Sequence, residues 1–366
     1  MTRCKMKACI CVILMITLLL FPVQAEENFE EQIRNSLSDL VPAEVAEAAG
    51  GMEALFTEEG AEQLGVGFIL RMAGQALGKA IRPVLSHFAM LFGMVLIVGA
   101  AGLMKSSSIE PLISLICTLT VALASYNLIY DHISVSAALI EYLTGFMTAM
   151  HGVMGLLWSV SGNAVSAAVT GSSMLLSLTV LENIAKFMLS PLLMLCFALS
   201  LVSTVSGELR GITAFIRTTF STILGFIMML LMTVIGSQNA IAQSADSNLM
   251  RTIRFAAGTF IPVIGGAVSE AARTIAGGVG MLKSITGTVG VVILLVVTLP
   301  VIISLFLERA AFHLAAESAK LMGIDSASGF LGEIKNLFDL AIGLVCAFCM
   351  MFIFSMILFA KSSTAV

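Results

Sequence analysis

The sequence predicts an all-α, polytopic helical membrane protein, and three observations lead there. The chain of 366 residues is 58% hydrophobic, and its mean hydropathy is +1.02. Charged residues make up 11% of it, less than half of the roughly 25% found in soluble domains. Apolar runs close to the roughly 20 residues that a transmembrane helix needs recur along the chain. We therefore expect about seven or eight transmembrane helices and one apolar segment broken by glycine and proline.

The N-terminal part is expected to be exported. Residues 1–25 resemble a signal peptide, with Arg3, Lys5 and Lys7 before an apolar core and the small-residue site VQA after it. The alternative is an uncleaved anchor, which would export the same region. Residues 26–82 form an acidic segment and then an amphipathic stretch typical of a helix on a membrane surface or a partner.

Residues 83–361 form the predicted transmembrane domain, followed by a short tail at 362–366. The expected spans are 83–104, 111–130, 140–160, 164–181, 187–206, 218–236, 286–307 and 338–360. We expect a polar connection at 237–254 and an amphipathic helix at 309–322. The membrane orientation of the last spans stays open.

The broken apolar segment, residues 255–282, is the predicted conduit or gate. It holds six glycines, one proline and two opposite charges, and such segments often line a cavity or a polar path. It either crosses the membrane or re-enters as a hairpin, which we favour. Its candidate residues are Gly258, Pro262, Gly265, Gly266, Glu270 and Arg273. Glu270 and Arg273 could instead be an ion pair that only offsets its own insertion cost.

Two further ionisable residues bracket the third expected span. Glu141 lies near its start, where a solvated position is the alternative, and His151 lies inside it, where plain packing is the alternative. They are secondary candidates, because ionisable groups within a span often mark a functional path.

Motifs for chemistry are missing from the sequence. It contains no HExxH, no GxSxG and no complete phosphate-binding loop, so we expect no catalytic residues, no cofactor and no enzyme activity. Cys346 and Cys349 form a CxxC inside an apolar span with no second pair, and we expect buried thiols there and not a metal site. No basic cluster points to nucleic acid.

The block RTIRFAAGTFIPVIGG at 251–266, followed by the apolar run 287–305, resembles the stage III sporulation protein AE family of endospore-forming bacteria. The similarity covers nearly all of the chain after the signal peptide and is strongest between about 249 and 307. It implies a permease-like subunit of a multiprotein channel between mother cell and forespore, in the mother-cell-derived membrane. It also implies partners: other stage III sporulation proteins, which include ring-forming subunits and a secretion-type ATPase.

Two alternatives remain open at this point. One is a stand-alone secondary transporter with Glu270 and His151 as coupling groups. The other is a structural membrane scaffold whose exported face binds partners. The transported molecule and the stoichiometry are not contained in the sequence.

Overall fold

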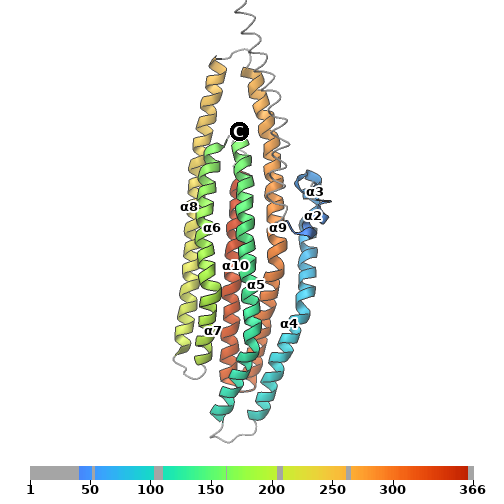
Figure 1. The fold of residues 1–366 in the computed structure, drawn as a ribbon, viewed down its shortest axis with the longest axis vertical. Coiled ribbons are helices and arrows are strands. Elements are labelled where there is room, and N and C mark those ends of the chain that lie inside the picture. The colour runs from blue at the N-terminus through green and yellow to red at the C-terminus, as the bar shows by residue number, and fades with distance from the viewer. Residues whose placement is uncertain are drawn as a thin grey trace, which may run out of the picture.

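The long elements of the protein are all helices that run along one axis of an elongated bundle (Figure 1). The computed structural model describes residues 41–51, 54–102, 110–161, 163–203, 209–260 and 265–361; only the backbone is described for 249–260, for 265–283 and at some other helical positions. The long helices are α4 (Val66–Gly102), α5 (Glu110–Val160), α6 (Ala164–Phe187), α7 (Leu193–Val202), α8 (Leu209–Phe260), α9 (Gly265–Leu321) and α10 (Asp325–Lys361). Before them come α2 (Ala43–Ala48), η1 (Ala54–Phe56) and α3 (Glu58–Gln63). These ranges contain no strand, so the all-α prediction is confirmed.

Six helices of the described part are long and apolar enough to cross a membrane: α4, α5, α6, α8, α9 and α10. This is slightly fewer than the seven or eight spans predicted, because two pairs of predicted spans are joined. The predicted signal peptide lies outside the described residues. The predicted boundary between residues 82 and 83 lies inside α4, which continues through Pro83.

The second and third predicted spans are a single helix, α5. A dip in hydropathy at Asp131 and His132 resembled a turn, but no glycine or proline occurs between 112 and 144 to end the helix. At 1.5 Å per residue, the 51 residues of α5 reach about 77 Å, more than twice the thickness of a hydrocarbon core.

The fourth and fifth predicted spans are also joined. Between α6 and α7, residues Met188–Leu192 form a π-helical turn that contains Pro191. Proline has no N–H for the helical ladder, and one wide turn accommodates it without ending the helix. The predicted polar connection at 237–254 is likewise wrong, since this stretch lies within α8.

The core of the bundle lies among α5, α9 and α10, and α4 and α8 flank it (Figure 1). Aromatic side chains join α5 to α10: Phe146 lies 5.5 Å from Phe352 and Trp158 lies 5.2 Å from Phe359, between ring centroids. Helix α4 packs on α9, and α6 packs between α5 and α8. The outward apolar side chains of α4 and α8 fit a lipid environment.

The α9–α10 turn is fixed by a glycine. Gly323 has φ +74°, a conformation that costs glycine little. Its N–H donates to the carbonyl of Lys320, and the N–H of Ile324 donates to the carbonyl of Ala319. These two bonds end α9 with the pattern of a Schellman motif, and α10 begins two residues later.

Candidate functional site

The predicted conduit residues lie on both sides of one helix–helix connection. Gly258 belongs to α8, whereas Gly265, Gly266, Glu270 and Arg273 belong to α9. Pro262 lies outside the described residues, and so do the side chains of the others. Figure 1 shows that the described ends of α8 and α9 extend beyond the α5–α6 turn. The conduit role of these residues stays a prediction.

The secondary candidates do not come together. Glu141 is exposed on α5, where it lines a groove with the ion pair Glu182–Lys186 of α6. His151 is buried on the same helix, and its Nε2 has no hydrogen-bond partner. Ten residues of helix separate the two, about 15 Å along the axis, so they cannot form one site.

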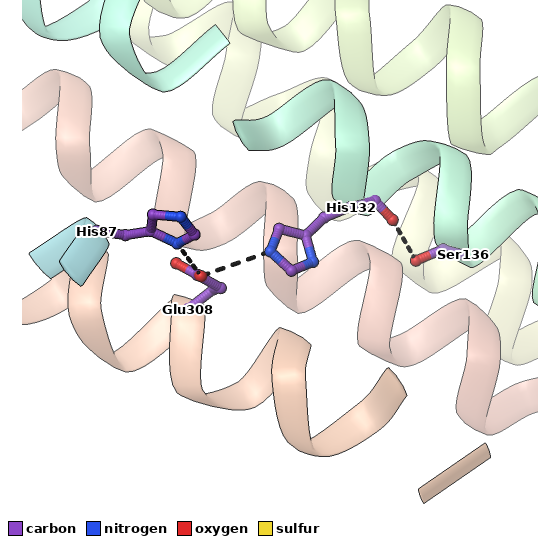
Figure 2. A network of polar contacts seen from close by, with 4 residues as sticks. All are labelled: His87, His132, Ser136 and Glu308. Carbon is purple, nitrogen blue, oxygen red and sulfur yellow. Dashed lines mark hydrogen bonds and ion pairs between the residues drawn. The ribbon is translucent and has the colours of Figure 1, made fainter. Parts of the chain in front are cut away.

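A different ionisable group stands out in the structure, a carboxylate enclosed by two histidines (Figure 2). Glu308 of α9 accepts a hydrogen bond at Oε1 from Nδ1 of His87 on α4, over 2.6 Å. Nε2 of His132 on α5 lies 3.5 Å from the same oxygen. We call these three residues the histidine–glutamate cluster. It joins three helices at one oxygen atom.

The carboxylate of Glu308 is the most buried member of this cluster. Its side chain is 1% exposed, against 32% for His87 and 17% for His132. Its second oxygen, Oε2, is buried and has no hydrogen-bond partner. An isolated buried carboxylate is costly, and a neighbouring imidazole lowers that cost by donating a hydrogen bond or by carrying a compensating charge.

Neighbouring contacts fix the cluster in place. The ring of His132 packs edge-to-face against Phe338 of α10, with centroids 5.7 Å apart. Ser136 donates to the carbonyl oxygen of His132, one turn earlier on α5, over 2.8 Å (Figure 2). Arg309, the residue after Glu308, forms an ion pair with Asp339 of α10. Two consecutive residues of α9 thus bind three other helices.

Sequence reasoning missed this cluster. His87 and Glu308 are 221 residues apart, and nothing local links them. Glu308 follows directly on the apolar run 286–307 and looked like the first polar residue beyond a span. The available signal was an acidic residue at the end of one apolar run, a histidine near the start of a second and another histidine just after a third.

The cluster can hold and exchange a proton between imidazole and carboxylate. Both group types bind protons reversibly, and they are within hydrogen-bond distance. No group of three His, Cys, Asp or Glu side chains in the described part of the chain is arranged to hold a metal ion. Cys196, Cys346 and Cys349 are free thiols.

The six long apolar helices of the described residues, with a buried ionisable cluster among four of them, define a multi-pass helical membrane protein. Within that class, the chain belongs to the family of stage III sporulation protein AE, whose family model matches residues 56–363. The family resemblance seen in the sequence is thereby confirmed.

A curated relative, stage III sporulation protein AE of Bacillus subtilis (strain 168), is 28% identical over 190 residues. That match spans 48% of this chain and 48% of the relative, about half the length of each. No solved structure matches the chain.

Proposed function

We infer that this protein is a permease-like membrane subunit of the multiprotein channel that links mother cell and forespore during endospore formation. The observation that carries the proposal is the family match over most of the chain, which includes the six long apolar helices of the described residues. In this proposal the protein is not an enzyme. It contributes a helical membrane body and is needed for late forespore development.

The proposed location is the mother-cell-derived membrane around the engulfed forespore. Proposed partners are the other stage III sporulation proteins of the channel, among them ring-forming subunits and a secretion-type ATPase. The short helices α2, η1 and α3 stand before the first long helix, and the proposed exported segment that contains them would offer a docking surface.

Deleting the gene in its spore-forming host tests this role. We expect normal vegetative growth and normal engulfment, followed by arrest of spore maturation, with rescue by the wild-type gene. Normal spores from the deletion strain would refute the proposal. A transport defect in growing cells would instead favour a stand-alone secondary transporter.

One observation gives that second candidate function physical support. Glu308 is a buried acid with histidine partners inside an apolar bundle, and ionisable groups in such positions serve as coupling groups in transporters. The predicted coupling residues were Glu270 and His151, so the histidine–glutamate cluster would take over or share that role.

The conduit role of 255–282 is part of the same proposal. Single cysteines placed along this segment, in a chain without the seven native cysteines, should react with an impermeant thiol reagent if water lines it. If no position reacts from either side, the segment packs as a scaffold. In that case, replacing Glu270 and Arg273 together should also be milder than replacing either one.

A further inference from the structure

A polar seam, separate from the histidine–glutamate cluster, runs between α6 and α8. On α6 it consists of Ser166, Thr170, Ser173 and Ser177, all buried and spaced four, three and four residues apart. This spacing places them on one face of the helix. On α8 it consists of Gln238, Asn239 and Asp246, which lie in the stretch 237–254 that the sequence predicted to be a polar connection.

Two contacts fix how the helices face each other across this seam. The carboxylate of Asp246 accepts hydrogen bonds from the backbone N–H groups of Val165 and Ser166, over 2.9 and 2.8 Å. Farther along, the hydroxyl of Ser173 donates to the side-chain oxygen of Gln238. The two contacts are seven to eight residues apart on α6 and eight apart on α8, so the two helices run antiparallel in a constant register.

Three side-chain atoms in the seam are buried and have no hydrogen-bond partner. They are the hydroxyls of Ser166 and Thr170 and the amide nitrogen of Asn239. A buried polar group left without a hydrogen-bond partner destabilises the folded protein. Three such groups in one seam would use up a large share of the marginal stability of a folded protein, unless water or a polar molecule satisfies them.

The seam ends at an apolar floor. One turn beyond Ser177, α6 places Leu181 on the same face, and α8 places Ile235 just below Gln238; both are 0% exposed. From Ser166 to Ser177 the seam covers 11 residues of helix, about 16 Å, roughly half of a 30 Å hydrocarbon core. The seam therefore covers only part of the membrane thickness.

We propose that this seam is a hydrated vestibule, with Asp246 and Ser166 at its mouth and Leu181 and Ile235 at its floor, that holds water and admits small uncharged polar solutes. The three unpartnered groups include hydroxyls, which can both donate and accept, and an amide that donates. Such a lining satisfies water and neutral polar molecules. Anions would meet the carboxylate of Asp246 at the mouth. The inference concerns the membrane body and stands apart from the role in sporulation.

Thiol modification of the full-length protein in membrane vesicles tests the vestibule. Single cysteines replace Ser166, Thr170 or Asn239 in a chain without native cysteines, and a small impermeant methanethiosulfonate is added from each side in turn. Matched controls are Met174→Cys and Leu178→Cys, on the same helix and equally buried, with Leu181→Cys and Ile235→Cys at the floor. Labelling after denaturation confirms that every thiol is intact.

The seam cysteines should react from one side at least about tenfold faster than the controls, because a thiol ionises readily only where water reaches it. Floor cysteines should react as slowly as the controls. Equal rates at all positions would overturn the proposal and leave the seam as dry small-residue packing.

A second variant keeps the test decisive even if a cysteine substitution disturbs the fold locally. Thr170→Val lies between the mouth and Asn239, so it should slow modification of Asn239→Cys several-fold and leave Ser166→Cys unchanged. If Thr170→Val changes neither rate, or both equally, the vestibule is excluded. The readout is made in membranes from growing cells, so it is independent of the spore phenotype that tests the proposed function.

Discussion

Two buried carboxylates of this protein are stabilised in different ways. Asp246, in the polar seam, is held by two backbone N–H groups at the start of α6. Glu308, in the histidine–glutamate cluster, is held by imidazole rings from α4 and α5. Backbone N–H groups cannot change their protonation state, whereas imidazole can. Asp246 is therefore a fixed structural acceptor, while Glu308 lies in a site that can change charge.

The two regions also differ in which of their buried atoms lack a hydrogen-bond partner. In the cluster, the single unpartnered atom belongs to the ionisable group itself, Oε2 of Glu308. In the seam, the unpartnered atoms belong to neutral hydroxyl and amide groups, and the carboxylate is satisfied. One region is suited to a proton and the other to neutral polar molecules.

The largest expected effect comes from removing both histidines of the cluster. In His87→Ala with His132→Ala, Glu308 loses its side-chain partners while it stays buried. Breaking a buried ionic interaction in this way costs about 3–5 kcal/mol. We expect a large fall in thermal stability of the purified protein in detergent.

A triple variant separates stability from function. Adding Glu308→Leu, with leucine also at 87 and 132, removes every ionisable group of the cluster and should recover most of the lost stability. If the cluster only joins helices, the triple variant should also restore spore formation. If the cluster moves protons, spores should stay defective although the protein folds. A double variant as stable as the wild type would show that the cluster carries no charge interaction.

The helical fold could be predicted because burial in lipid imposes long apolar helices, which composition alone reveals. The number of transmembrane spans could not be predicted in the same way. The hydropathy dips at residues 131–132 and around Glu182 looked like turns. Instead, His132 contacts Glu308 and Glu182 lines the α5–α6 groove, and both lie within continuous helices. A single sequence does not distinguish a polar residue that makes a tertiary contact within a helix from a polar residue that ends a transmembrane span.

The two polar regions escaped the sequence for a related reason. The cluster depends on contacts across 221 residues, and the seam on a register between two helices. The polar stretch 237–254 appeared unsuited to a membrane helix until its partner, the Ser- and Thr-rich face of α6, was known. Composition alone cannot say which polar residues meet.

A moderate loss of stability is expected when Asp246, at one end of the seam, is substituted. Asp246→Ala removes the two hydrogen bonds that backbone N–H groups in the first turn of α6 donate to this carboxylate, which should cost about 1–3 kcal/mol. Asp246→Asn keeps a capping oxygen and should lose clearly less, as thermal unfolding would show. If Asn and Ala are equally destabilising, the negative charge itself matters, and the contrast with Glu308 would be weaker.

The smallest expected change in stability, and the one that depends most on whether water occupies the seam, comes from substituting two serines of α6. Ser166→Ala removes a hydroxyl without a protein partner, and Ser177→Ala removes one that donates to the carbonyl of Ser173 over 2.8 Å. Both are buried and both gain the same small helix propensity on becoming alanine, so Ser177→Ala is the matched control.

Whether Ser166→Ala lowers or raises the stability of the protein, relative to the wild type and to Ser177→Ala, decides whether water occupies the seam. If water bonds Ser166, its replacement loses a hydrogen bond, and Ser166→Ala should be less stable than the wild type by about 0.5–1.5 kcal/mol. If the seam is dry, the same substitution removes an unsatisfied buried group, and it should be more stable than both the wild type and the control. Unfolding of the three proteins side by side in the same detergent measures this sign. A stabilising Ser166→Ala would make the seam a packing surface and leave the histidine–glutamate cluster as the polar site of this pair that is suited to transport.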